Sequence, residues 1–225
     1  MRLIVRDLTR SFEKKTLLDR ISYTFEEGRI YGILGSRKSG KTAFLRCITG
    51  DLSYDDGEII LSDERGDHVP GYNDVELTFD IPILPDFMSG REFVRYYMDV
   101  HGRGDLDENE YLALAGVGAD EYDELLRFYT DDVKRQLQLV INLISGPRVL
   151  LLDEPFDKAD EDMDNLVEEV IDRLKENHII IVTAPEISQI NRVCTDFLYL
   201  NKGKLTSLSH ENTESIRIIS AEDLA

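Results

Sequence analysis

The sequence predicts an α/β protein in which a mixed β and parallel α/β core surrounds an inserted helical region at about residues 80–145. The runs RVLLLD and HIIIVTA are continuously apolar, as strands buried on both faces of a parallel sheet are. The segment between them carries apolar residues on one helical face. These residues are Met163, Leu166, Val167, Val170, Ile171 and Leu174. Together the three segments predict a β-α-β unit, which defines the parallel part of the core.

The first part of the chain is predicted to be mainly strands. RLIVRDL alternates apolar and polar residues, and LLDRISYTFEEG repeats that pattern before a turn. RIYGILG is a short apolar run that closes on Gly35, which indicates a buried strand. KTAFLRCITG is predicted to be a helix because Phe44, Leu45 and Ile48 share one face and Gly50 suits a C-cap. GEIILSD is another short strand.

The middle of the chain is irregular from residue 70 to 85 and helical after it. SGREFVRYYMDVHG is predicted to be a helix with Ser89 as N-cap. Its apolar stripe is Phe93, Tyr96, Tyr97 and Val100. Two acidic helical stretches follow near 107–116 and 120–128, and residues 131–145 form a strong helix. The apolar side of that helix is Val133, Leu137, Val140, Ile141 and Ile144. DFLYLNKGKLTSL is predicted to be a terminal hairpin, and the last fifteen residues are not assigned.

Composition and charge restrict the class of protein. The 225 residues are 42% hydrophobic and 8% aromatic, which indicates a globular chain. The formal net charge of −19 repels nucleic acid, so no nucleic-acid partner is expected. Cys47 and Cys194 lack a framework spacing, which fits a reducing cytoplasm. The start, MRLIVRDLTRSF, is unlike a signal peptide, and no apolar run approaches the roughly 20 residues that span a bilayer. Any membrane role therefore requires another chain to span the bilayer.

Residues 35–42, GSRKSGKT, match the phosphate-loop pattern G-x-x-x-x-G-K-[ST]. The glycines let successive amides point at phosphate, Lys41 is expected to reach the β- and γ-phosphates, and Thr42 to ligate Mg²⁺. A buried strand before the loop and a helix after it favour this interpretation over a chance Gly/Lys turn. The predicted nucleotide-binding residues here are Gly35, Ser36, Arg37, Lys38, Ser39, Gly40, Lys41, Thr42 and Ala43. For Arg37 and Lys38, pointing into solvent is the alternative.

The stretch VLLLDEP ends a hydrophobic strand in acidic residues. Asp153 is expected to hold Mg²⁺ through water, and Glu154 to polarise an attacking water near the γ-phosphate. Acidic turn residues are common at strand ends, so this stretch alone would favour a structural role. Its pairing with the phosphate loop favours the catalytic role.

The two motifs, their order and their separation resemble those of the ATP-binding cassette (ABC) ATPases that drive membrane transporters, over residues 1 to about 208. SFEKKTLLDRISYTFEEGRIYGILG is similar to the opening of that family, in which an aromatic residue stacks on adenine. Phe12 falls at that position, although a strand core residue is a competing interpretation. LPDFMSGREFVRYYMDVHG resembles the helical subdomain of exporter-type members. DEPFDKAD resembles the turn that follows the acidic strand in the family, with Asp160 in the aspartate position. DFLYLNKGKL resembles the last hairpin of the family.

The resemblance implies one P-loop NTPase domain over residues 1–225, with an antiparallel β subdomain and an inserted α-helical subdomain. The nucleotide-binding core would lie at about 1–78 and 146–208, the helical subdomain at about 79–145, and a C-terminal tail at 209–225.

Three positions depart from the family pattern. The signature LSGGQ is replaced by YTDDV at Tyr129–Val133. The loop that carries a glutamine in the family reads LTFDIPIL, with Phe79 or Asp80 nearest. The family histidine that contacts the γ-phosphate is replaced by Ala184 or Pro185 in IIIVTAPE. Signature, glutamine loop and histidine loop are therefore all degenerate.

The two aspartates of YTDDV have opposite effects on structure and chemistry. Thr130 can cap the following helix, and Asp131 and Asp132 favour its first turn. In the family, however, this segment of one subunit covers ATP held by the other. A carboxylate about 5 Å from a phosphate charge costs roughly 3 kcal/mol at an effective dielectric of 20. The segment is therefore expected to be a good helix start and a poor phosphate cap.

These features predict a cytoplasmic ATP-binding subunit that lies on the inner face of the cell membrane through a separate transmembrane permease subunit. It would bind Mg²⁺ and ATP and hydrolyse ATP weakly, with a second ABC ATPase subunit as partner and a heterodimer favoured over a homodimer. A catalytically silent regulatory module is the alternative, which the missing histidine and glutamine favour and Glu154 opposes. Another P-loop class, a GTPase or small-molecule kinase, ranks lower. NKGK at 201–204 resembles a guanine-reading NKxD, but Lys204 replaces the aspartate.

Overall fold

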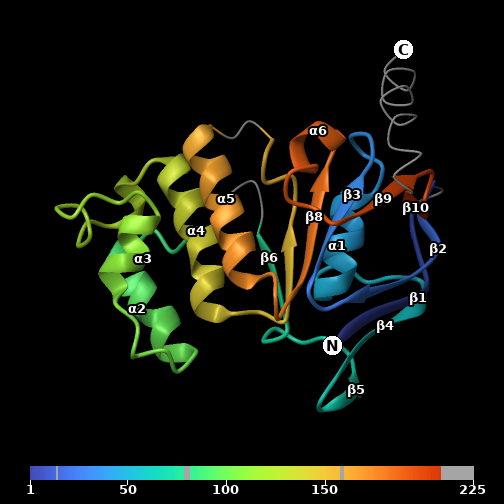
Figure 1. Ribbon diagram of the computed structural model, residues 1–225, viewed down its shortest axis with the longest axis horizontal. Coiled ribbons are helices and arrows are strands. Elements are labelled where there is room, and N and C mark those ends of the chain that lie inside the picture. Colours follow the sequence, from blue (N-terminus) through green and yellow to red (C-terminus); the bar gives the residue numbers. More distant parts are fainter. Residues whose placement is uncertain (14, 79–81, 158–159, 209–225) are drawn as a thin grey trace.

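The computed structural model describes residues 1–13, 15–78, 82–157 and 160–208. Two β-sheets lie side by side at one end of the elongated molecule, and three helices, α2, α3 and α4, gather at the other end (Figure 1). Helix α5 lies between these two parts. The predicted glutamine-loop positions Phe79 and Asp80 and the tail at 209–225 fall outside the described residues. Among the described residues, no helix has the length and apolar character needed to cross a membrane.

The smaller sheet is antiparallel and has four strands. In spatial order they are β2 (Lys15–Glu26), β1 (Arg2–Phe12), β4 (Asp56–Asp63) and β5 (Gly66–His68). Its inner face is apolar because the alternation along β1 places Leu3 and Val5 on one side, and a register shift after Val5 brings Leu8 to the same side. All three residues are buried. A bulge interrupts the pairing of β1 with β4 between Arg6 and Thr9. The strands predicted from RLIVRDL, LLDRISYTFEEG and GEIILSD are confirmed.

The larger sheet has six strands, two of which lead into the phosphate loop and into the acidic residues Asp153 and Glu154. In spatial order they are β10 (Lys204–Leu208), β9 (Asp196–Asn201), β3 (Arg29–Leu34), β8 (Ile179–Ala184), β7 (Val149–Leu152) and β6 (Val75–Thr78). All neighbours pair in parallel except β10 and β9, which form the predicted antiparallel hairpin. The carboxyl ends of β3, β7 and β8 therefore meet at one edge, at the top in Figure 1.

The two faces of this sheet belong to two different cores. Residues alternate along each strand, so that in β7 Val149 and Leu151 pack with helix α1 (Lys41–Thr49) and the antiparallel sheet. Leu150 and Leu152 face the other way, toward helix α5 (Glu161–Leu174) and the helical part. All six predicted apolar residues of α5 are buried. The predicted β-α-β unit is thus confirmed as β7, α5 and β8, and a short helix α6 (Ile187–Ile190) follows β8.

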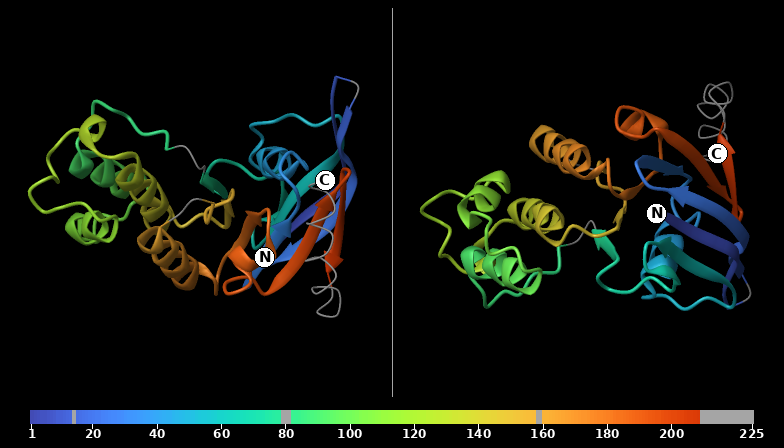
Figure 2. Two further views of the ribbon diagram at one scale, coloured as in Figure 1. Left: turned by 90° about the horizontal axis from the view of Figure 1, so that it is seen from above. Right: turned by 60° about the horizontal axis from the view of Figure 1, so that its bottom comes forward.

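The helices of the far end are α2 (Gly90–Val100), α3 (Glu108–Leu114) and α4 (Asp131–Ser145), with a short 3₁₀ helix at Leu126–Phe128. Ser89 caps α2 in a reciprocal capping box with Glu92. The predicted stripe of α2 was wrong in two positions, because Tyr96 and Val100 are 56% and 61% exposed. The buried face is instead Gly90, Phe93, Val94 and Met98. Figure 2 shows α2 and α3 packed on α4 from two further directions.

The acidic helix predicted at 120–128 is absent, and turns lead there into the 3₁₀ helix. The carbonyls of Tyr122 and Glu124 accept hydrogen bonds from the amides of Arg91 and Gly90 instead of closing a helix. These amides belong to the first turn of α2, where no partner exists within the helix. These long-range backbone hydrogen bonds therefore take the place of the helix that the local sequence pattern predicts.

The irregular stretch 70–85 also contains strand β6, which the sequence pattern did not reveal. β6 has only four residues and lies at the edge of the larger sheet, where it pairs with β7. Its Val75 and Leu77 pack in the core shared with α1.

Candidate nucleotide site

The phosphate loop connects the buried strand β3 to helix α1, and its shape depends on close backbone approaches. A Cβ on Gly35 would lie 2.6 Å from both the Leu200 carbonyl and Ser39 Oγ, so only glycine fits. Gly40 precedes α1 with a φ of 109°, in the left-handed region. Lys38 also has a positive φ, of 67°. Its neighbour Ser39 has a buried Oγ without a partner among the described residues.

Lys41 lies in the floor of this loop. Its side chain is only 4% exposed, and Nζ donates to the carbonyls of Gly35 at 2.6 Å and Ser36 at 3.1 Å. The same ammonium is 3.1 Å from Glu154 Oε1. The loop and the acidic strand, more than a hundred residues apart in the chain, are therefore joined by an ion pair.

A second link joins the two predicted metal ligands. Thr42 Oγ1 donates to Asp153 Oδ2 at 2.7 Å, so the hydroxyl and the carboxylate already face one point. Oxygen donors of this kind are the ligands that Mg²⁺ prefers. No group of three or more His, Cys, Asp or Glu suited to a metal occurs in the described part of the chain. An ion held here would take Thr42 and Asp153 and complete its shell with phosphate and water oxygens.

The sequence analysis missed Thr183, which contacts both acidic residues. Its side chain is fully buried at the end of β8, next to the end of β7. Thr183 Oγ1 donates to Asp153 Oδ1 at 2.7 Å and accepts the amide of Glu154 at 2.9 Å. The available signal in the sequence was the single threonine near the end of the apolar run HIIIVTA. A hydroxyl buried at such a position requires a polar partner, which indicates a contact with the neighbouring strand end.

A hollow of about 250 Å³ opens beside the loop, between the β1–β2 and β9–β10 hairpins. It is lined by Lys15, Thr16, Leu17, Ser36, Arg37, Lys38, Ser39, Asn201, Lys202 and Gly203. Four of these residues are cationic and none is acidic, in a chain with 45 acidic and 26 basic residues. The hollow is thus a locally basic site on an acidic protein, which suits phosphate.

Phe12 ends strand β1 at the edge of this region, and its side chain is 61% exposed. It is therefore available to stack on a flat ring, and the interpretation of Phe12 as a strand core residue was wrong. Arg37 lies 3.6 Å from Asp157 but is 73% exposed, and Lys38 is exposed. Ala43 is half-buried in the first turn of α1, where its amide belongs to the positive end of the helix.

Two of the three departures lie among the described residues, at the start of α4 and at the end of β8. Thr130 caps α4 by accepting the Val133 amide, and Asp131 and Asp132 are exposed in its first turn. Asp132 also pairs with Arg135 at 2.6 Å. Ala184 is buried at the end of β8. Both aspartates therefore serve the helix start as local physical chemistry predicts.

Comparison with known proteins identifies the chain. The sequence model of the ABC transporter family matches residues 18–157, more than half of its length. The chain belongs to the ABC transporter family. As an ABC ATPase domain it has the α/β P-loop fold, and its phosphate loop and acidic strand both lie within the matched segment.

Individual members agree with this assignment. The ABC ATPase is 29% identical over 206 residues to an uncharacterised ABC transporter ATP-binding protein, YybJ, of Bacillus subtilis, covering 89% of this chain and 93% of the relative. A solved ATP-binding subunit of an ABC transporter superposes with a TM-score of 0.80 over 98% of this chain and 95% of its own, at 18% identity. A dimeric post-hydrolysis structure of the ATP-binding cassette MJ0796, bound to ADP and Pi, superposes with a TM-score of 0.76. The superposition covers 92% of this chain and 99% of that structure's chain, at 16% identity.

Proposed function

We propose that this ABC ATPase binds Mg-ATP at Gly35–Thr42, hydrolyses it weakly, and thereby drives a separate membrane-spanning permease from the cytoplasmic face. The observation that carries the proposal is the convergence of Lys41, Thr42, Asp153 and Glu154 at one edge of the sheet. The cradle formed at Gly35, the unpartnered Ser39 hydroxyl and the basic hollow fit a polyphosphate.

The roles of the residues follow from their contacts. The loop amides and Lys41 would hold the β- and γ-phosphates, and Phe12 would stack on the base. Thr42 and Asp153 would hold Mg²⁺, which neutralises charge on the phosphate oxygens. A triphosphate would compete with Glu154 for the ammonium of Lys41. Once released from that pair, the Glu154 carboxylate is free to accept a proton from an attacking water.

The proposed partners are a permease and a second ABC ATPase subunit. The dimeric structure of MJ0796, whose fold this chain shares, supports pairing in general. The exposed Asp131 and Asp132 in the first turn of α4 favour a heterodimer, because two identical chains would place carboxylates at both shared sites. A different subunit with an ordinary signature would leave the site formed by Lys41 and Glu154 well covered.

The second candidate function is that of a regulatory module which binds ATP without turning it over. The buried Ala184 favours it, because a methyl group cannot contact the γ-phosphate as the family histidine does. The position of Glu154 beside Lys41 opposes it. Hydrolysis measured together with the partner subunit would separate the two functions, since only the first predicts turnover that depends on Glu154.

Nucleotide binding tests the proposal directly. Lys41→Ala should weaken MgATP binding by roughly 10- to 100-fold, because it removes charge-assisted hydrogen bonds from a buried position. Lys175→Ala is the control, since Lys175 is exposed at the end of α5 and lies outside both the loop and the hollow, and it should change the affinity by less than about threefold. Thr42→Ala should chiefly reduce the dependence on Mg²⁺. Calorimetric titration with ATP and GTP measures all three, and unchanged ATP affinity in Lys41→Ala would refute the site.

A further inference from the structure

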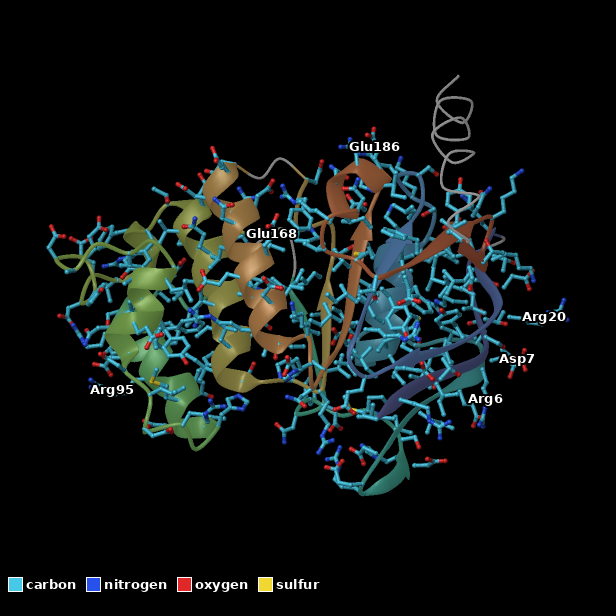
Figure 3. All side chains as sticks on the ribbon, in the orientation of Figure 1. Arg6, Asp7, Arg20, Arg95, Glu168 and Glu186 are labelled. Carbon is cyan, nitrogen blue, oxygen red and sulfur yellow. The ribbon has the colours of Figure 1, made fainter. Side chains whose placement is uncertain are left out.

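We propose that Thr183 is the positioning residue of the hydrolytic site, holding Asp153 and Glu154 in their working geometry through one hydroxyl. This inference rests on the proposed ATPase function. The hydroxyl lies on β8, whereas both acidic residues follow β7, so the contact crosses between neighbouring strands. In Figure 3, Glu186 marks the edge at which β8 ends, three residues beyond Thr183.

The contacts of Thr183 are both directed at the site. Its Oγ1 donates its only proton to Asp153 Oδ1 at 2.7 Å, while Thr42 donates to the other oxygen, Oδ2, at 2.7 Å. Both oxygens of the Asp153 carboxylate are therefore fixed, which sets the plane of the group. A metal ligand oriented in this way retains one defined direction for its remaining lone pairs.

The second contact fixes the backbone of Glu154. Glu154 has a φ of 50°, a left-handed conformation that a residue with a side chain adopts only when its surroundings hold it there. Its amide donates to Thr183 Oγ1 at 2.9 Å, and its carboxylate pairs with Lys41 at 3.1 Å. The threonine thus holds the backbone end of Glu154 and leaves the carboxylate end free to exchange Lys41 for water.

The hydroxyl of Thr183 differs from that of another buried threonine nearby. Thr78 is 8% exposed at the end of β6, on the opposite side of β7, and its hydroxyl accepts from the side chain of Asn142 at 3.1 Å. Asn142 keeps other acceptors in the carbonyls of Leu139 and Gln138. The two threonines therefore share burial and sheet position, but only the hydroxyl of Thr183 contacts the acidic residues. Thr78 contacts Asp153 through its carbonyl alone, which accepts the Asp153 amide at 3.2 Å and is retained in Thr78→Val.

The test compares Thr183→Val, Thr183→Ser and the matched control Thr78→Val in the full chain. Valine keeps the shape of threonine and removes the hydroxyl, and serine restores the hydroxyl. Thr183→Val should lower kcat by roughly 10- to 100-fold with KM for ATP changed less than about threefold, and raise the Mg²⁺ concentration needed for ATP binding about tenfold. Thr183→Ser should recover most of both, and Thr78→Val should resemble the unaltered chain.

Amide hydrogen exchange gives a readout that needs neither nucleotide nor turnover. The Glu154 amide should exchange at least about tenfold faster in Thr183→Val than in Thr183→Ser or Thr78→Val, because its acceptor is lost. Equal effects of the two valine variants on kcat, Mg²⁺ requirement and Glu154 exchange would overturn the inference, as would failure of serine to rescue them. If the unaltered chain failed to bind ATP, the proposed function would fail, while altered Glu154 exchange would still uphold the contact.

Discussion

Lys41 is a buried cation whose partners in the structure compete with a nucleotide for it. It is held by two loop carbonyls and by Glu154. A phosphate that approaches the loop must displace at least the carboxylate, because two anions cannot both lie against one ammonium without mutual repulsion. In the proposed function, Glu154 would therefore act on nucleotide binding as well as on hydrolysis.

The substitution Glu154→Gln separates these two effects. It should abolish any hydrolysis, because the amide cannot accept the proton, and it should tighten ATP binding, because the competing charge is gone. Removing a partly exposed ion pair of about 1 kcal/mol corresponds to roughly a fivefold lower Kd. Calorimetry and phosphate release measure the two quantities. Weaker ATP binding would mean that Glu154 does not compete for Lys41, and equal turnover would mean that it is not the base.

Glu76, on strand β6, gives a pH-dependent prediction. Burial raises the pKa of its carboxyl, so the folded chain holds this proton more tightly than the unfolded chain. Below the unfolded pKa the group is neutral in both states, and above the folded pKa the full penalty of burying the charge applies. Glu76→Gln should therefore raise the free energy of unfolding at pH 7.5 and lose this advantage near pH 4. Urea unfolding at both pH values measures it, and an equal gain at both would contradict the assignment.

At the candidate site, the residues could be proposed from the sequence more readily than the contacts between them. Gly35, Lys41, Asp153 and Glu154 were recognisable because their types and spacing follow from phosphate and metal chemistry. Thr183 was not, since its importance comes from the parallel pairing of β7 with β8, which places it beside Asp153. The exposure of Phe12 was also undetermined, because alternation in a strand does not say which residue passes the edge of the core.

Among the elements, those with a one-dimensional signature were predicted correctly. The apolar runs that form β7 and β8 are typical of strands covered on both faces of a sheet, and both strands are buried there. Helix α5 buries all six residues that were predicted to be its apolar face. The stretch at 120–128 was predicted incorrectly, because its carbonyls serve the amides of Gly90 and Arg91 on α2. A local sequence pattern cannot reveal hydrogen-bond donors that lie about thirty residues away in the chain.

The bulge between β1 and β4 gives a prediction about one element. Gly57 has a φ of 100°, and a Cβ there would lie 2.5 Å from the Arg6 carbonyl. Gly57→Ala should cost about 2–4 kcal/mol of stability, from backbone strain and overpacking against a rigid backbone. Gly66→Ala is the control, because it has a similar φ of 95° but open space, and it should cost about 1 kcal/mol. Urea midpoints compare them, and equal losses would mean that the contact carries no cost.

Figure 3 shows Arg6 and Asp7 at the end of the molecule that carries the antiparallel sheet, opposite the end that carries Arg95 of α2. The Gly57→Ala strain is therefore remote from α4, and it should leave the helical end unchanged. Exchange protection of the α4 amides provides the check, since it should be the same in both glycine variants.

At the scale of the whole molecule, charge works against self-association. The chain carries a net charge of −19, and the start of α4 adds two exposed carboxylates where a partner's phosphate would lie in the proposed dimer. The helix gains from these charges, because they face its positive end, whereas a dimer of two identical chains loses from them twice. In the proposed dimer, the same residues would thus stabilise the single chain and disfavour the pairing of two identical chains.

The last prediction concerns this balance. With Glu154→Gln to prevent turnover, the chain should remain mainly monomeric in ATP and Mg²⁺. Adding Thr130→Ser, Asp131→Gly and Asp132→Gly should produce ATP-dependent self-association, because the roughly 3 kcal/mol repulsion at each shared site is removed. It should also lower helix stability by about 1–2 kcal/mol, since the favourable charges are lost and two glycines enter the first turn.

Asp67→Asn with Asp105→Asn removes two exposed charges elsewhere and should leave the chain monomeric. Sedimentation velocity distinguishes these states. A tight ATP-bound homodimer of the chain carrying Glu154→Gln alone would overturn the heterodimer, and it would require the two carboxylates to turn away from the phosphate or to carry a proton or metal ion.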